Sequence, residues 1–171
     1  MNIQDAIYAR RSIRKFEQKP VEKEKLELLL KAAMAAPSGM NIQPWEFVVI
    51  TNPETLKEIR SSLMFAKFDA PAAISVCGNL SLFKKPMAST FWVQDCSAAT
   101  ENILLSAVGL GLGTVWLGVH PVHVFTKRIS ALLKLPKHVI PLNVIYVGYP
   151  SEDKPPRTQY DESKVHWETY S

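Results

Sequence analysis

The spacing of hydrophobic residues along the chain predicts a mixture of helices and short strands. In residues 22–35, leucines and an alanine recur every three or four positions, which is typical of an amphipathic helix. Pro37 ends this helix, because the residue before a proline is displaced from the helical region. Short apolar runs bounded by glycine, proline or polar residues indicate buried strands instead. The predicted helices cover residues 3–10, 22–35, 53–63, 91–110 and 122–133, and the predicted strands cover residues 45–50, 72–77, 114–119 and 140–147.

The helix predicted over residues 91–110 is apolar or small on nearly every side. A helix of that composition is buried, and in so short a chain we expect it to lie centrally, at an interface between two subunits. Residues 102–126 carry no formal charge, but four glycines interrupt them and Pro121 closes them. We therefore interpret this segment as the end of a helix followed by a buried strand, and not as a membrane span.

The length of 171 residues corresponds to a single domain with one arm. We predict a folded domain over residues 1–150 and a C-terminal arm over residues 151–171 that belongs to the same fold. The arm is polar and contains prolines in its first part, and its last residues, 165–170, are rich in aromatic side chains. We expect such a segment to dock on a surface, and a second copy of the chain is one candidate.

The composition narrows the class of ligand. A net charge of +4 and a pI of about 9.1 suit an anionic ligand. They do not indicate a nucleic-acid-binding protein, because the sequence has no dense stripe of Lys and Arg interleaved with aromatic residues. Cys77 and Cys96 match neither a metal spacing nor a disulfide framework, so we interpret them as buried thiols in a reducing compartment. The first ten residues lack the apolar stretch of a signal peptide, and we expect a cytoplasmic protein.

A cluster of basic residues follows the first predicted helix. Arg10, Arg11 and Arg14 lie within five positions, with Ser12 between them. A guanidinium group is a planar, permanently charged fork that suits phosphate oxygens, and a serine hydroxyl adds another donor. If Arg10, Ser12 and Arg14 face the same way, they form a compact receptor for a doubly charged anion. The alternative is a solvated run of charges.

Residues 36–45 form a second polar segment. Pro37, Ser38 and the glycine after them have the composition of a turn. Asn41 and Gln43 each offer a donor and an acceptor, and we expect both to point to one side of an extended segment, since the proline that follows favours an extended Gln43. Two amides that point together can bind the edge of a flat heteroaromatic ring. The alternative is a surface loop whose polar groups contact only water.

Two other patterns carry no predicted function. The glycines at positions 109, 111 and 113 lack the spacing of a dinucleotide-binding loop, and they follow a helix where that loop follows a strand. His120 and His123 are three positions apart, but Pro121 lies between them and no acidic or thiol ligand is near them in the sequence. We therefore predict no metal site.

The chain resembles the FMN-dependent nitroreductase family over almost its whole length. The resemblance rests on four segments in the family's order: residues 10–16, residues 36–45, residues 111–118, and the ending from residue 148 through Arg157 to residue 168. Each segment is unspecific alone, but four in the right order are quite specific. The ending is similar to that of the compact members of the family, and the region after the second strand is shorter here than in the larger relatives.

The resemblance implies an α+β fold with helices around a central, mostly antiparallel sheet. It also implies an intertwined homodimer in which the C-terminal arm wraps the partner subunit and two FMN molecules lie at the interface. Arg10, Ser12 and Arg14 would hold the phosphate and the ring edge, and Arg14 is our candidate for stabilising charge at flavin N1 and O2. The remaining implied residues are Arg11 beside them, Arg157 closing on the phosphate, the backbone of Trp116, Leu117 and Gly118 at the ring, and Pro37, Ser38, Asn41 and Gln43 from the partner subunit.

The implied activity is hydride transfer from NADH or NADPH through flavin N5 to a small oxidant, such as a nitroaromatic or a quinone, in a ping-pong sequence. Because the cofactor carries this chemistry, we expect no catalytic side chain. Larger relatives have a lysine near the ring after the second strand, and Lys67 is an open candidate for that role. Two alternatives stay open: a non-enzymatic flavin or nucleotide binder, and a flavin enzyme of the same fold that performs dehalogenation or flavin breakdown.

Overall fold

The computed structural model describes residues 2–84 and 87–170. Each of the predicted helices and strands is present within a few residues of its expected bounds. The α-helices are α1 (Ile3–Ala9), α2 (Lys23–Met34), α3 (Pro53–Ser62), α4 (Trp92–Gly109) and α5 (His123–Leu132). The strands are β1 (Trp45–Ile50), β2 (Ala72–Asn79), β3 (Gly113–Gly118) and β4 (Val139–Gly148). Short 3-10 helices are η1 (Gly39–Asn41), η2 (Leu80–Leu82), η3 (Ala88–Phe91) and η4 (Glu162–Lys164).

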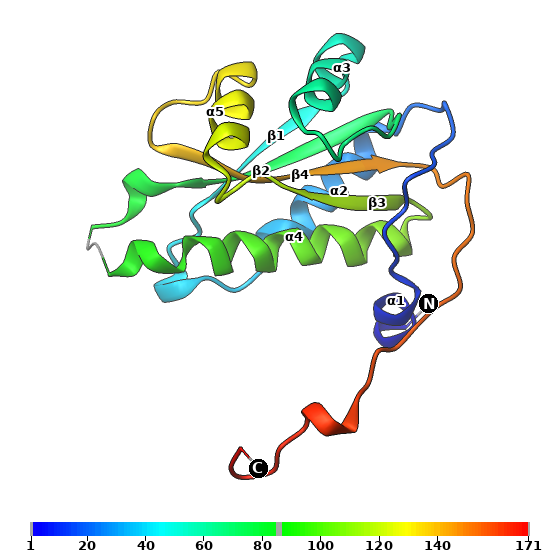
Figure 1. The fold of residues 1–171 in the computed structure, drawn as a ribbon, viewed down its shortest axis with the longest axis vertical. Coiled ribbons are helices and arrows are strands. Elements are labelled where there is room, and N and C mark those ends of the chain that lie inside the picture. Colours follow the sequence, from blue (N-terminus) through cyan, green and yellow to red (C-terminus); the bar gives the residue numbers. More distant parts are fainter. Residues whose placement is uncertain (1, 85–86, 171) are drawn as a thin grey trace.

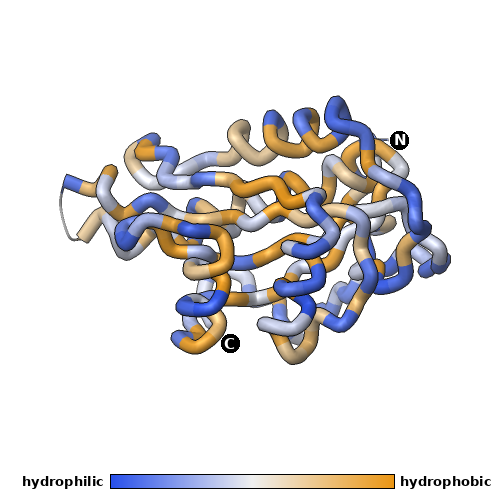
Figure 2. Tube along the Cα trace, turned by 90° about the horizontal axis from the view of Figure 1, so that it is seen from above, coloured by the Kyte–Doolittle hydropathy of each residue, from blue (hydrophilic) through white to orange (hydrophobic). Residues whose placement is uncertain are grey.

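The four strands form one antiparallel sheet in the order β1-β2-β4-β3. Helices α2 and α4 cover one face, and α3 and α5 cover the other, so that the molecule has three layers (Figure 1). Hydrophobic residues follow the strands through the middle of these layers, while hydrophilic residues gather in the connecting loops (Figure 2). This arrangement confirms the expected α+β class with a sheet flanked by helices.

Local sequence signals explain where several helices begin. Helix α1 has a capping box, in which the Asn2 side chain accepts a hydrogen bond from the Asp5 amide and the Asp5 side chain accepts one from the Asn2 amide. Helix α3 begins with Pro53 after Asn52, whose side chain accepts from the Thr55 amide at 3.0 Å. These caps satisfy amides that have no partner inside the helix.

Helix α4 is the buried helix that the sequence predicts. It packs against α2 and against the sheet, with Cys96, Ala99 and Ile103 in the core. The buried Asn143 side chain of β4 donates to the buried Thr100 hydroxyl of α4 at 2.9 Å, which compensates the burial of both groups. Both cysteines are buried and free, as expected. Within the described parts of the chain, no helix combines the length and the hydropathy that crossing a membrane requires.

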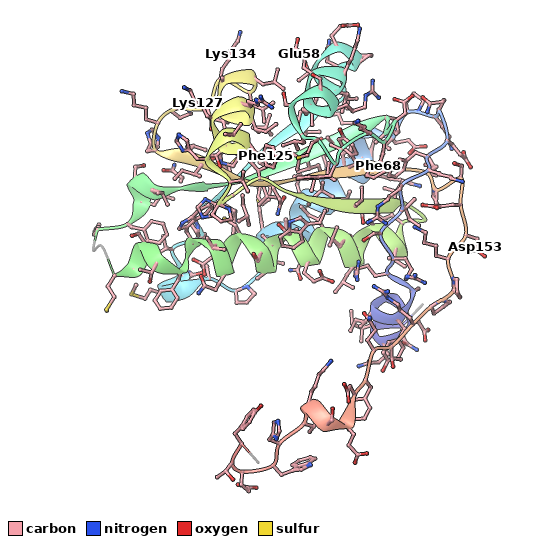
Figure 3. All side chains as sticks on the ribbon, viewed as in Figure 1. Glu58, Phe68, Phe125, Lys127, Lys134 and Asp153 are labelled. Carbon is pink, nitrogen blue, oxygen red and sulfur yellow. The ribbon has the colours of Figure 1, made fainter. Side chains whose placement is uncertain are left out.

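The segment after β4 first follows the N-terminal segment and then leaves the body. The Ser151 amide donates to Lys15 O at 3.0 Å, and the Arg157 amide donates to Tyr8 O at 3.0 Å. Beyond Arg157 the chain extends away from the sheet, with its side chains directed into the surroundings (Figure 3). Trp167 is 82% exposed and Tyr170 is 92% exposed. Within one copy, the aromatic end of the arm is therefore left unburied.

Candidate functional site

The arginine segment (residues 10–15) lies along the outer edge of β3. The Ile13 amide donates to Thr114 O at 2.8 Å, and Ser12 forms a parallel bridge with Thr114. Ile13 and Phe16 are buried and fix the segment to the body. The close approach of this segment to β3 requires a glycine at position 113, because an added Cβ there would lie 2.8 Å from three Ile13 atoms. The position of this segment is thus set by an isolated bridge to β3 and by the burial of Ile13 and Phe16.

The three guanidinium groups point to different neighbours within one chain. Arg10 Nε lies 3.4 Å from Glu101 Oε1 on α4, and Arg11 Nη1 donates to Pro155 O in the arm. The Arg14 guanidinium lies over the Phe68 ring, 5.7 Å from its centroid. A single chain therefore places the cluster along one edge but does not gather its charges into one receptor. Burial raises the pKa of Glu101, while the nearby Arg10 opposes that rise.

Two residues that the sequence analysis did not assign fix the backbone of the arginine segment. Glu152 Oε1 accepts from the Arg14 amide at 2.6 Å and from the Lys15 amide at 3.3 Å. Lys154 Nζ lies 3.1 Å from the same oxygen and donates to Ser12 O at 2.6 Å. The hydrogen bond from the Arg14 amide, followed by the contact with Lys154, lowers the pKa of Glu152. No sequence rule connects positions 138 residues apart, so only the fold shows this contact.

Strand β3 presents an open backbone edge beside the arginine segment. Thr114 O faces away from β4, because it accepts from Ile13. Residues two apart in a strand point the same way, so the N–H and C=O groups of Trp116 and Gly118 face this outer edge. No hydrogen bond to another described residue occupies them there. Leu117, in contrast, is buried and directs its backbone toward β4.

The amide loop (residues 37–43) is a tight turn and not the extended segment expected from the sequence. Met40, Asn41 and Gln43 have φ angles of 51°, 53° and 53°, in the left-handed region. The turn forms because the Asn41 amide donates to Ser38 O at 3.0 Å and the Gln43 amide donates to Ser38 Oγ at 3.0 Å. The proline after Gln43 excludes the right-handed helical region but does not impose extension. The two exposed side-chain amides have no hydrogen-bond partner among the described residues.

The amide loop and the arginine segment contact different parts of α4, the loop at the first turn and the segment at the middle of the helix. The Gly39 amide donates to Asp95 Oδ1 at 2.8 Å in the first turn of α4, whereas Arg10 pairs with Glu101, about 9 Å further along the axis. Figure 1 shows α1 beside the C-terminal part of α4 and the loop before β1 near its other end. Arg157 lies near the arginine segment, because its backbone amide donates a hydrogen bond to Tyr8 O in α1. One chain thus carries two separate halves of the expected site.

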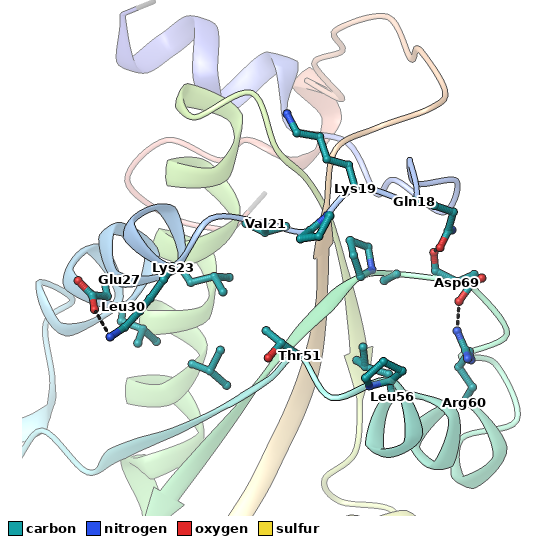
Figure 4. Close-up of a pocket in the computed structure, with 16 residues that line it drawn as sticks. Gln18, Lys19, Val21, Lys23, Glu27, Leu30, Thr51, Leu56, Arg60 and Asp69 are labelled. Carbon is teal, nitrogen blue, oxygen red and sulfur yellow. Dashed lines mark hydrogen bonds and ion pairs between the residues drawn. The ribbon is translucent and has the colours of Figure 1, made fainter.

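A cavity of about 810 Å³ lies elsewhere, between α2, α3 and the free edge of β1 (Figure 4). Its apolar lining includes Val21, Leu30 and Leu56, and its rim carries the Arg60–Asp69 ion pair. None of the expected cofactor residues lines it. Lys67, the candidate lysine, is exposed. The adjacent residue Phe68, and not Lys67, contacts Arg14.

Comparison with known proteins identifies the class. The model of the Nitroreductase family matches residues 7–73 and 62–149, and the chain belongs to this family. A protein of Methanothermobacter thermautotrophicus with the provisional name NADH dehydrogenase/NAD(P)H nitroreductase is 44% identical over 99% of this chain and 88% of its own.

Two solved structures show how far the likeness in fold extends. A Parabacteroides distasonis protein with the same provisional name is 39% identical with a TM-score of 0.93, and the match covers 98% of both chains. An FMN-dependent nitroreductase from Clostridium difficile is 32% identical with a TM-score of 0.88, and the match covers 98% of this chain and 99% of that one. These values agree with the α+β architecture described above.

Proposed function

We propose that this chain is an FMN-dependent oxidoreductase that uses NADH or NADPH and acts as a homodimer with one FMN at each of two interface sites. The observation that carries the proposal is the division of the polar residues into two halves, one at the first turn of α4 and the other beside the middle of that helix. Neither half alone encloses a ligand, and two copies related by a two-fold axis would bring unlike halves together twice.

The first half fits the phosphate end of FMN. Arg11, Ser12 and Arg157 lie in the arginine segment and at the start of the arm, next to α1. The Arg157 guanidinium is exposed, and the Ser12 hydroxyl has no partner among the described residues. A phosphate would also compete with Glu101 for Arg10, because a guanidinium binds either anion in a similar geometry.

The second half, together with the outer edge of β3 beside the first half, fits a ring with alternating donors and acceptors. The outer edge of β3 offers backbone groups of Trp116 and Gly118, and the amide loop of the other copy would offer the side chains of Asn41 and Gln43. Ser38 Oγ already accepts from the Gln43 amide, but its proton stays available to donate. We include Pro37 as the residue that begins this turn.

Bound FMN would accept hydride from NADH or NADPH and pass electrons to a small oxidant, such as a nitroaromatic or a quinone. The chain contributes binding and electrostatics to this chemistry. Arg14 is our candidate for placing a positive charge near N1 and O2, where negative charge grows on reduction. Among described contacts, its guanidinium is held by the Phe68 ring and not by a carboxylate, so its charge is available to a ligand.

The arm and the cavity at β1 support an assembly of two copies. Strand β1 pairs only with β2 in the described chain, so its outer edge is open. The cavity beside that edge is lined mainly by apolar side chains. The arm ends in exposed Trp167 and Tyr170, which the body of the same copy does not cover. We therefore propose that the arm of one subunit wraps the other and buries these side chains in it.

The proposal is tested with the purified full chain. We expect a yellow protein with a two-band flavin spectrum that bleaches when NADH or NADPH is added. Steady consumption of the nicotinamide in the presence of a quinone or nitroaromatic would support the enzyme. A flavin-loaded protein that does not turn over would instead identify a flavin-binding protein, and a colourless monomer that ignores added FMN would reject both.

A further inference from the structure

The amide loop has an unfavourable backbone that needs external support. Met40, Asn41 and Gln43 are not glycines, yet all three have φ near +50°. At Met40 and Gln43 this conformation costs on the order of 1–2 kcal/mol each and persists only where surrounding contacts enforce it, whereas Asn41 adopts it more readily. Met40 itself contributes little to such contacts, since its side chain is 70% exposed.

Most hydrogen bonds of the loop stay within the loop. The Asn41 and Ile42 amides donate to Ser38 O and Gly39 O, and Ser38 Oγ accepts from Gln43. Such bonds shape the turn but do not fix its place on the protein. At its C-terminal end, Pro44 O accepts from the Asn79 amide at 2.7 Å. The middle of the loop is joined to a helix by a different bond, from the Gly39 amide to Asp95 Oδ1 at 2.8 Å.

Asp95 occupies a setting unusual for a carboxylate. Its side chain lies in the first turn of α4, where the helix dipole favours negative charge. The residue is only 5% exposed, and its second oxygen, Oδ2, has no hydrogen-bond partner among the described residues. An acidic residue is rarely buried with so few partners, because the loss of hydration is costly. The strong bond to Gly39 is the visible compensation.

We infer that Asp95 is a positioning residue, which holds the strained amide loop in the conformation that presents Asn41 and Gln43 to the cofactor. The identity of the ligand rests on the proposed function, whereas the contact between Asp95 and Gly39 does not depend on it. Asp95 acts through Gly39 and touches no reacting atom. Its carboxylate would fix the loop before a ligand arrives, so that the entropy lost in ordering the loop does not weaken cofactor binding.

The test compares Asp95→Ala and Asp95→Asn in the full chain. Asp95→Ala removes the acceptor, whereas Asp95→Asn keeps one oxygen that can accept from the Gly39 amide. A hydrogen bond to a charged group accounts for about tenfold or more in an equilibrium. We expect Asp95→Ala to speed hydrogen exchange at the Gly39 amide about tenfold and to raise the Kd for FMN by a similar factor. We expect Asp95→Asn to stay within about threefold of the parent for both.

Thr100→Val is the matched control. Thr100 is buried on the same helix and accepts from Asn143, but it does not contact the amide loop. This variant should lower the free energy of unfolding while leaving Gly39 exchange and the Kd for FMN unchanged. If Thr100→Val changes them as Asp95→Ala does, Asp95 has only a general structural role and the inference is overturned.

The remaining outcomes separate the inference from the proposed function. Unchanged Gly39 exchange in Asp95→Ala overturns the inference, whatever the flavin does. Faster exchange with unaltered FMN affinity also overturns it, because the loop would then be held without being used. If the parent protein binds no FMN, the proposed function fails, and the positioning role toward FMN fails with it, even where the exchange data show the Asp95 contact.

Discussion

The two halves of the proposed site are held in place by different means. The arginine segment is joined to the edge of β3 by an isolated bridge at Ser12 and a backbone hydrogen bond from Ile13, and Glu152 and Lys154 reinforce its backbone. The amide loop is a left-handed turn joined to α4 through one buried carboxylate. The first half is bridged to the edge of the sheet, while the second is a loop attached to a helix. We therefore expect a substitution that forces the arginine segment off β3 to disturb the fold, and loss of the contact between Asp95 and the amide loop to disturb mainly the ligand.

The largest effect is expected where the arginine segment meets β3. In Gly113→Ala, the new Cβ would lie 2.8 Å from three atoms of the branched Ile13 side chain. Overpacking of this kind costs about 1–3 kcal/mol, and it would move the arginine segment from its place. We expect a lower free energy of unfolding in urea and weaker FMN binding. Gly109→Ala is the control, because an added Cβ there meets nothing within 4 Å; equal losses in both variants would contradict the account.

The next effect concerns the redox potential and not stability. Arg14→Ala should leave some FMN bound but lower its midpoint potential by about 30 mV, equivalent to ~1.4 kcal/mol for a two-electron couple. Reduction by NADH or NADPH should slow accordingly. Lys15→Ala removes a neighbouring exposed charge and controls for net charge. An unchanged potential in flavin-loaded Arg14→Ala would remove the proposed role of that residue.

A smaller effect should distinguish strain from side-chain contact in the amide loop. Met40→Gly relieves the left-handed strain and should raise the free energy of unfolding by about 0.5–1 kcal/mol. Met40→Ala removes the same side chain but keeps a Cβ at a φ of 51°, so it should gain nothing. Urea unfolding of both variants measures the difference. Equal stability of the two would show that backbone strain at Met40 is unimportant.

The smallest expected effect is a change in the pH dependence of stability. The pKa of Glu152 is lowered below its ordinary value of 4.5 in the folded chain, and the largest cause is the hydrogen bond that its carboxylate accepts from the Arg14 amide. A carboxylate with a lowered folded pKa adds stability above pH 4.5 and loses it as the pH falls through the lowered value. Glu152→Gln should therefore be less stable than the parent at neutral pH, and the gap should close in acid. Urea unfolding at several pH values measures this gap, and a gap that stays constant into acid would contradict the role given to Glu152.

The sequence predicted the elements well and the site unevenly. Apolar periodicity located the helices and strands, because α4 and β2 bury so much of their surface that pattern and structure agree. The turn at Met40, Asn41 and Gln43 escaped prediction, since left-handed backbone at residues other than glycine leaves little signal in a single sequence.

Long-range contacts also escaped the sequence analysis. Glu152 meets Arg14 only after the chain has passed through the whole sheet, and Asp95 meets Gly39 across 56 positions. The three guanidiniums point apart because the residues that they contact, Glu101, Pro155 and Phe68, come from three separate parts of the chain. Residue types could be inferred from the sequence, but their partners could not.

The central claim is that each cofactor is held by the arginine segment of one copy and the amide loop of another. Mixing two defective variants tests it most directly: one with Arg10 and Arg14 replaced by alanine, the other with Asn41 and Gln43 replaced by alanine. If sites are shared between copies, each mixed dimer regains one intact site, and FMN binding and NAD(P)H consumption return to about half of the parent level per mixed dimer. No recovery on mixing, in dimers shown to have exchanged subunits, would contradict the claim.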